Sequence, residues 1–168
     1  MTLRHLSSLI ALACVLSACA SHRESITTVP VGPPPSVARG SSPNGALVVF
    51  SALDIHGENP DVDQLHHSGY NIYSLNGKLL KRVYNQIGTH IGDPATVPLA
   101  PGKYKITAAA AAFGAVTVPI VIQPGKATFV HLDGSELSTG TQTATSRLVR
   151  LPDGLIIGWE AEEDSPSK

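Results

Sequence analysis

The densest group of side chains able to bind a metal ion lies between residues 54 and 67. Its carboxylate, amide and imidazole groups belong to Asp54, His56, Glu58, Asn59, Asp61, Asp63, His66 and His67. Oxygen ligands suit Ca²⁺, and imidazoles suit Zn²⁺. The spacing lacks the glycine and terminal glutamate of an EF-hand, and adjacent histidines on an extended chain point in opposite directions. We therefore expect a solvated loop between the first two strands and no bound metal. The alternative is a metal-dependent hydrolase, whose ligands would be His56, Asp61, Asp63, His66 and His67.

Nucleophilic catalysis has weaker support. Serines are plentiful and His90 and His131 are available, but no Gly-X-Ser-X-Gly elbow occurs. Catalytic triads form in space, so residue counts alone favour none. We expect no catalytic residues and no enzymatic activity, with His131 as a partly buried or edge histidine of a strand.

Four aromatic side chains could stack on sugar rings, as in a carbohydrate- or peptidoglycan-binding module. They are Trp159, Tyr70, Tyr73 and Tyr84. Such a module would present them as an exposed row. Aromatic residues make up 5% of the chain, so the simpler interpretation is that they fill the core, with Trp159 closing one end of the fold.

Cys19 is the remaining group with distinctive chemistry. Arg4 and His5 precede an apolar run, Leu6 to Leu16, which is the plan of a secretory signal peptide. The run is far shorter than the ~20 residues of a membrane-spanning helix, so we expect none in the mature chain. Cys14, the other cysteine, would leave with residues 1–18, so the mature chain would hold one unpaired thiol.

The tetrapeptide Leu16-Ser17-Ala18-Cys19 resembles the lipobox of bacterial lipoproteins. The resemblance implies diacylglyceryl transfer to the Cys19 thiol, cleavage after Ala18 and acylation of the new amino group. It also implies delivery to an outer membrane, because Ala20 follows the cysteine. The alternative is an ordinary signal peptide that leaves a free thiol. We expect an exported protein that is anchored to the cell envelope by the covalent lipid at Cys19. We expect no cofactor.

Composition limits the partners of such a protein. With 13 acidic and 12 basic residues, the chain as a whole lacks the positive excess of proteins that bind nucleic acid or an anionic membrane surface. A hydrophobic fraction of 42% indicates a folded domain, and the small side chains predict a thin core. The expected partners are the bilayer, through the acyl anchor, and an envelope protein or polysaccharide.

Proline, glycine and serine divide the chain into segments. Residues 19–44, including Pro33 to Pro35, read as a tether that holds the domain off the bilayer. Residues 45–161 read as the folded domain, and the acidic residues 162–168 as a disordered tail.

Strand patterns fill the domain and predict an all-β fold, a single antiparallel β-sandwich of about seven or eight strands. Ala46 to Ile55 reads as one buried strand. Asn76-Gly77 predicts a two-residue type I′ turn between strands at Gly69–Leu75 and Lys78–Tyr84. Lys103 to Ala112 alternates like a strand although Ala108 to Ala112 would suit a helix.

The later strands carry their own signals. Pro119 argues for an edge strand or a bulge within Val116 to Gln123. Pro124-Gly125-Lys126 predicts a turn, and Pro152-Asp153-Gly154 predicts a final hairpin.

Part of this domain resembles the PEGA-type and carboxypeptidase-regulatory-like modules. The similar segments are Val97 to Ile106 with its Pro101-Gly102 turn, Val116 to Ile122, Gln123 to Lys126, Phe129 to Leu132 and the preceding Tyr70 to Val83 hairpin. The resemblance implies a small sandwich of prealbumin-like or Ig-like topology. It also implies a binding or spacer function at the cell surface, without shared catalytic residues.

Overall fold

The computed structural model describes residues 27–35, 40–56, 64–85, 93–135 and 147–162. They form an all-β fold in which no helix occurs. The twelve strands of this part of the chain are β1 (Val31–Gly32), β2 (Gly45–Phe50), β3 (Leu53–His56), β4 (Gln64–His67), β5 (Tyr70–Ser74), β6 (Leu79–Val83), β7 (Thr96–Leu99), β8 (Gly102–Ala110), β9 (Gly114–Ile122), β10 (Ala127–His131), β11 (Leu148–Arg150) and β12 (Ile156–Glu160).

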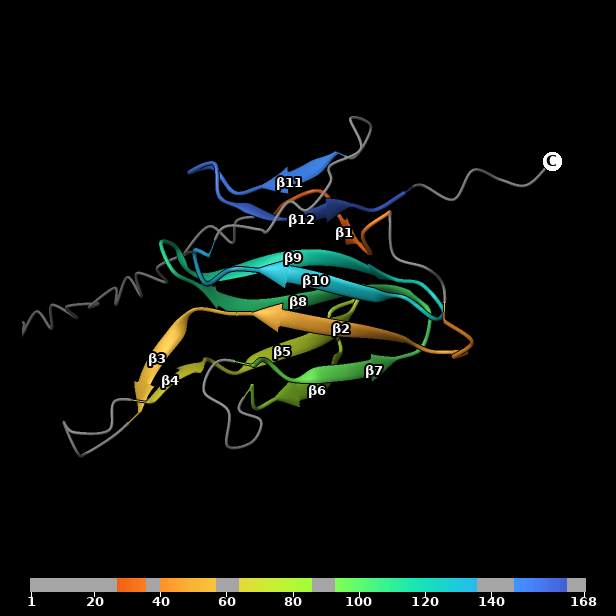
Figure 1. The fold of residues 1–168 in the computed structure, drawn as a ribbon, viewed down its shortest axis with the longest axis horizontal. Helices are drawn as coiled ribbons and strands as arrows, with labels where there is room; N and C mark the ends of the chain where they lie inside the picture. The colour runs from red at the N-terminus through yellow and green to blue at the C-terminus, as the bar shows by residue number, and fades with distance from the viewer. Residues whose placement is uncertain (1–26, 36–39, 57–63, 86–92, 136–146, 163–168) are drawn as a thin grey trace, which may run out of the picture.

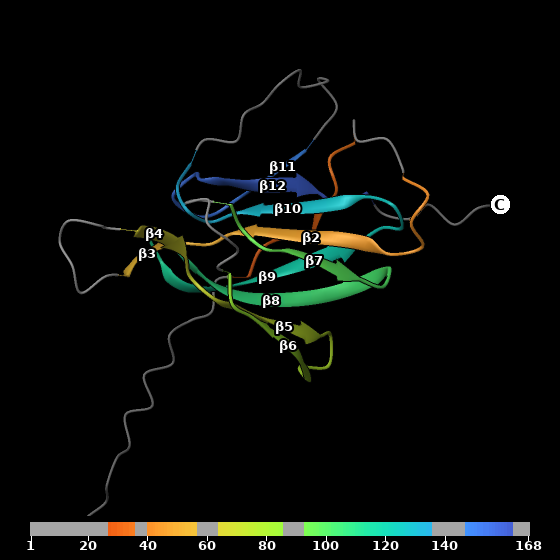
Figure 2. The ribbon, with the colours of Figure 1, turned by 60° about the horizontal axis from the view of Figure 1, so that its bottom comes forward.

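The strands are arranged in three sheets (Figure 1). The largest has seven strands in the order β11-β12-β1-β9-β8-β5-β6, and the second has three in the order β10-β2-β7. β3 and β4 form a separate hairpin that extends to one side of the body (Figures 1 and 2).

The two larger sheets share one hydrophobic core. Leu47 of β2 and Val130 of β10 are fully buried in the same cluster as Ile72 of β5 and Ile106 of β8. Burial alternates along β8 and β9, as expected for strands with one face on a core. The core consists mainly of Val, Ile, Leu and Ala, in agreement with the few aromatic residues in the sequence.

Two strand pairs correct the expectation of a purely antiparallel fold. β10 pairs with β2 in parallel, and β1 pairs with β9 in parallel. The Pro124-Gly125 turn, with Gly125 at φ 69°, therefore carries the chain from one sheet to the other rather than into a hairpin.

The expected tether does not extend uninterrupted to Asn44. Val31, which is fully buried, pairs with Glu160 of β12 and with Ile120 of β9. Thr27 already forms a parallel bridge to Thr117. The prolines did not prevent pairing because the neighbouring Val31 offers a β-branched side chain that the core buries.

The expected strand from Ala46 to Ile55 is two strands. Ser51 and Ala52 separate β2 from β3, and the Ala52 amide donates to the Ala109 carbonyl oxygen at 2.8 Å. The chain thus leaves the three-stranded sheet at Ser51 because that buried residue bonds to other segments instead.

The first expected hairpin forms with a different turn. The Ser74 amide donates to the Lys78 carbonyl oxygen at 3.0 Å, so the loop is the three residues Leu75, Asn76 and Gly77. Gly77 has φ 84°, the position that a three-residue hairpin loop assigns to glycine. The expected type I′ turn of two residues is therefore wrong, although the hairpin itself is confirmed.

Other local expectations have mixed outcomes. The final hairpin of β11 and β12 is confirmed, and β8 is a strand through Ala110 rather than a helix. Pro119 lies in neither an edge strand nor a bulge, because β9 is flanked by β8 and β1 and pairs with β8 in continuous register. The bridges to β1 and Thr27 are made by Ile120 and Thr117, on either side of Pro119.

Candidate functional site

A buried polar junction forms where β2 ends. The Ser51 hydroxyl donates to the Ser68 carbonyl oxygen at 2.6 Å and accepts from the Asn85 side-chain amide at 3.0 Å. The same amide donates to the Val49 carbonyl oxygen at 2.7 Å, and the Asn85 side-chain oxygen accepts from the Ala95 amide at 2.8 Å. Asn85 therefore ties β2 to the segments that follow β6 and precede β7.

Two histidines pack against Phe50 beside this junction. The His131 ring stacks on Phe50 with the centroids 4.4 Å apart and the planes 8° from parallel. The His67 ring meets Phe50 edge-on at 5.6 Å. His67 is buried, and its Nδ1 lies 2.7 Å from the Ser51 carbonyl oxygen. Phe50, His67 and His131 form the Phe50 cluster.

The strand register explains why these rings meet. Phe50 and His131 are partners across the parallel β2–β10 pair, so their side chains leave the sheet on the same face. His67 is the last residue of β4, and two residues separate it from β5. Its hydrogen bond to Ser51 brings the end of β4 next to the end of β2.

The electrostatics of the Phe50 cluster favour neutral imidazole at His131. Burial lowers the pKa of His131, the Asp133 carboxylate opposes this shift, and His67 adds to it. The His131 Nδ1 atom is buried and has no hydrogen-bond partner among the described residues. Since a general base must reach a substrate proton, a buried Nδ1 is unsuited to that task. The contacts that the structure shows in the cluster are ring packing and the approach of His67 Nδ1 to the Ser51 carbonyl oxygen.

The residues expected as metal ligands lie partly on the β3–β4 hairpin, not in a loop. Asp54 of β3 pairs with His66 of β4, and Leu53 pairs with His67. His66 and His67 are consecutive in one strand and therefore point to opposite faces. Within the described residues, no three His, Cys, Asp or Glu side chains are grouped as metal ligands. Asp61 and Asp63 lie outside the described residues, and the side chain of His56 is not described.

Tyr70 is a core residue and is excluded as a sugar-stacking platform. It is 3% exposed, and its hydroxyl is buried without a hydrogen-bond partner in the described part of the chain. Burial raises the pKa of Tyr70. Its position opposite Val83 and next to β8 places the ring between the sheets.

The other three aromatic residues do not form a row. Tyr73 is half-buried on the face of β5 opposite the core, and Tyr84 is 83% exposed just after β6. Trp159 is half-buried on β12, and three strands of the seven-stranded sheet lie between β12 and β5. A shared platform of Trp159 and Tyr73 is therefore excluded.

Several expected residues lie outside the described part of the chain. These are Cys19, the rest of the lipobox, Glu58, Asn59 and His90. The structure thus leaves the lipid attachment at Cys19 as a prediction from the sequence.

Sequence reasoning missed Phe50, Ser51 and Asn85. Ser51 did carry a signal, because it is the first polar residue after an apolar run that begins at Ala46. Asn85 had none, since an asparagine after a strand is typical of a loop. Its role depends on segments distant in sequence.

Comparisons of the chain with models of protein families, with curated proteins and with solved structures found no match. Among the described residues there is no helix of the length and apolarity that a bilayer crossing requires.

Proposed function

We propose that the chain is a lipid-anchored protein of the bacterial cell envelope whose β-sandwich body serves as a non-enzymatic interaction or spacer module. The observation that carries this proposal is the tetrapeptide Leu16-Ser17-Ala18-Cys19 directly behind an apolar run of signal-peptide length. A thiol at that position is the group to which a thioether-linked lipid can be attached.

The arrangement of the body supports the proposal. Two sheets share one core, as a β-sandwich requires, and this supports the prealbumin-like or Ig-like sandwich that we propose. The segments that resemble PEGA-type modules become the β5–β6 hairpin and strands β7 to β10. In the Phe50 cluster, the His67 Nδ1 atom faces the protein's own Ser51 carbonyl oxygen. A carbohydrate-binding module loses support because Tyr70 is buried and Trp159 is remote from Tyr73.

Intact-mass analysis of the protein purified from the membranes of a producing bacterium tests the anchor. We expect the wild-type chain to begin at residue 19 and to carry diacylglycerol and an amide-linked acyl chain. Cys19→Ser should retain the leader and carry no lipid. Cys14→Ser is the matched control and should match the wild type in mature mass.

A wild-type chain that is cleaved but not acylated would establish an ordinary exported protein instead. Retention of the leader by the wild type would also overturn the proposal.

A further inference from the structure

We propose that one face of the seven-stranded sheet docks on the surface of an anionic bilayer, the same bilayer that holds the acyl chains. The face consists of the side chains of β6, β5 and β8 that point away from the core, and we call it the cationic face. Its members are Leu79, Arg82, Asn71, Tyr73, Lys105, Thr107 and, at the start of β8, Lys103. The inference rests on the lipid anchor of the proposed function.

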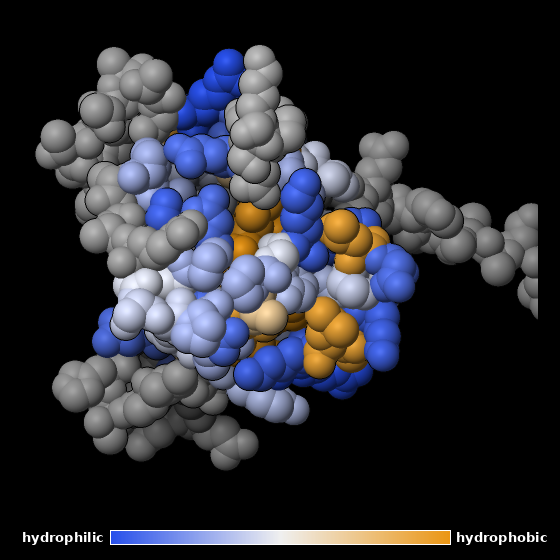
Figure 3. Space-filling model, turned by 90° about the vertical axis from the view of Figure 1, so that its right-hand side faces the viewer, coloured by the Kyte–Doolittle hydropathy of each residue, from blue (hydrophilic) through white to orange (hydrophobic). Residues whose placement is uncertain are grey.

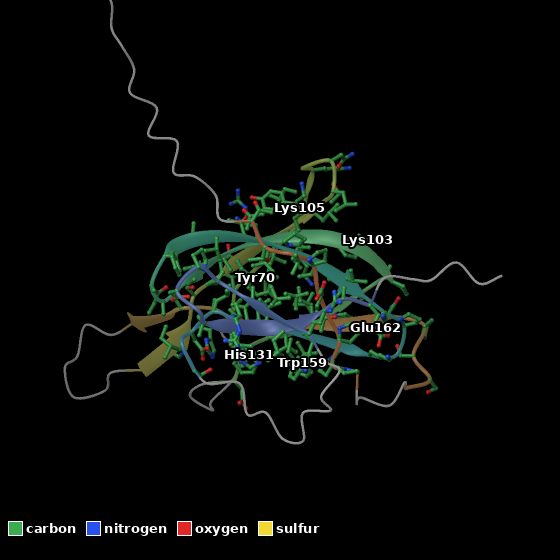
Figure 4. The ribbon with its side chains drawn as sticks, turned by 90° about the horizontal axis from the view of Figure 1, so that it is seen from above. Tyr70, Lys103, Lys105, His131, Trp159 and Glu162 are labelled. Atoms are coloured by element: carbon green, nitrogen blue, oxygen red, sulfur yellow. The ribbon has the colours of Figure 1, made fainter. Side chains whose placement is uncertain are left out.

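Register places these side chains together. Leu79 is opposite Tyr73, which is opposite Lys105, and in the next row Arg82 is opposite Asn71, which is opposite Thr107. Ile72 and Ile106, the alternating neighbours in β5 and β8, are fully buried, so the cationic face is the other side of the sheet. In Figure 4, Lys105 lies beyond β8 on the side away from Tyr70.

The charge of this region is predominantly positive. Between Gln64 and Leu132 the sequence contains six Lys or Arg residues and a single acid, Asp93. Five of those cations belong to the β5–β6 hairpin and the start of β8: Lys78, Lys81, Arg82, Lys103 and Lys105. The β11–β12 end of the same sheet is mixed, with Arg147 and Arg150 beside Asp153, Glu160 and Glu162. A nearly neutral protein therefore has a positive end.

Exposed apolar side chains accompany the cations. Leu75, Leu79, Leu80 and Tyr84 are all exposed, and all lie on the β5–β6 hairpin or next to it. In Figure 2 this hairpin is the lowest of the labelled strands, and Figure 3 shows hydrophobic areas beside hydrophilic ones on the side of the molecule toward which its turn lies. Leucine and tyrosine enter the interfacial region of a bilayer, while Lys and Arg bind lipid phosphates.

The anchor brings this face to the membrane. Thr27 bridges Thr117 of β9, and Thr117 is opposite Thr107 of β8. Thr27 therefore enters the sheet in the row of Asn71 and Arg82, four strand spacings or about 19 Å from Arg82. Only residues 20–26 separate Cys19 from Thr27. Even if this segment were fully extended, the Cα atoms of Cys19 and Thr27 would be at most about 29 Å apart.

A second copy of the chain is a poorer occupant. β6 is the edge strand of its sheet, and antiparallel pairing of two β6 strands would bring their cations, Lys81 and Arg82 of each copy, together. Opposed like charges destabilise such pairs. Phosphate-bearing lipid supplies the opposite charge and also accepts the leucines.

A fluorescent label on the cationic face tests the docking. Lipidation blocks Cys19, and Cys14 leaves with the leader, so Asn71→Cys in the mature lipoprotein can be labelled uniquely with an environment-sensitive dye. The matched control is Arg147→Cys, which is exposed just before β11 at the opposite edge of the sheet. Both proteins are reconstituted in phosphatidylcholine vesicles with or without an equimolar amount of phosphatidylglycerol.

We expect the dye at position 71 to shift to the blue and to be quenched by nitroxide-labelled lipid in the phosphatidylglycerol vesicles. The dye at position 147 should do neither. A cation near an anionic surface raises the ratio of docked to undocked protein about fivefold. We therefore expect Arg82→Glu and Lys105→Glu each to lower this ratio at least fivefold. Arg147→Glu, at the opposite edge of the sheet, should leave the ratio unchanged. Salt at about 1 M should detach the cationic face of the wild-type protein from the phosphatidylglycerol bilayer.

Equal dye signals at positions 71 and 147, or equal signals with and without phosphatidylglycerol, would overturn the docking. Added soluble polyphosphate that abolishes the signal at the same phosphate concentration would assign the face to soluble polyanions instead. Intact mass of the same samples separates the two proposals: an acylated chain without a dye shift contradicts the docking alone, and an unacylated chain with one contradicts the anchor alone.

Discussion

At the scale of single residues, the Phe50 cluster shows how this thin core accommodates polar rings. Phe50 offers one flat face to His131 and contacts the edge-on ring of His67. His67 binds the Ser51 carbonyl oxygen, whereas His131 Nδ1 is buried without a hydrogen bond in the described structure. The cost of burying an unpaired nitrogen is lower for neutral imidazole than for its protonated form, and this difference makes the site sensitive to acid.

The pH dependence of stability follows from the lowered pKa of His131. Unfolding restores the ordinary value of 6.5, so below that pH the unfolded chain binds more protons than the folded one. The contribution of neutral His131 is fully present above pH 6.5 and is lost as the pH falls toward the lowered folded pKa. We expect the free energy of unfolding in urea to decrease between about pH 7.5 and about pH 5.5, and to decrease less in His131→Phe, which keeps the stacked ring.

Asp133 and His67 are the neighbouring charged or titratable groups that act on His131, in opposite directions. Equal pH slopes for the wild type and His131→Phe would show that His131 is not the group responsible.

At the scale of elements, β1 is the least expected strand because it lies in a proline-rich segment. It joins β12 to β9 and thereby connects the final hairpin to the rest of the seven-stranded sheet. The close packing here is visible at Gly158, where a Cβ would lie 2.6 Å from Val31 Cγ1. A short strand thus completes the sheet.

The contrast between Val29 and Val31 tests whether this segment is a strand of the fold or part of a tether. Val31 is fully buried and Val29 is 52% exposed. We expect Val31→Ala to lower the free energy of unfolding by about 2 kcal/mol, through lost burial and the cavity left behind. Val29→Ala should change it by less than about 0.5 kcal/mol. Urea denaturation measures the free energy of unfolding of both variants. Equally small changes would show that Val31 is not part of the folded core.

At the scale of the whole molecule, positive charge gathers toward the β5–β6 end of the large sheet, and the chain joins that sheet early. The cationic face lies at one end of the seven-stranded sheet, and the other end, formed by β11 and β12, carries charges of both signs. Thr27 forms an isolated bridge to the sheet and β1 begins at Val31, so pairing starts well before residue 45 and the tether that we propose is the shorter segment 20–26. If Cys19 carries the lipid that we propose, this short segment keeps the body close to the bilayer rather than on a long stalk.

Lengthening the tether should weaken the docking in a defined way. A Gly/Ser insertion after Ala20 that makes the tether about fourfold longer doubles the mean height of the body, because the size of a flexible coil grows with the square root of its length. We therefore expect the docked-to-undocked ratio of the labelled Asn71→Cys protein to fall about twofold. An unchanged ratio would mean that the tether does not set the distance of the body from the membrane.

The sequence by itself determined the class of fold, the two hairpins and the alternation of β8 and β9, because these depend on local turn chemistry and on period-two burial. It also supplied the anchor hypothesis at Cys19, which lies outside the described structure.

Tertiary structure decided which strands pair across long separations. The parallel pairs β2–β10 and β1–β9, the meeting of Phe50 with His67 and His131, and the bonds of Asn85 all join segments far apart in the chain. No local pattern encodes such contacts, since each depends on how the two sheets bury one shared core. The cationic face has the same origin: its residues are ordinary in sequence, and the register of three strands places them on one surface.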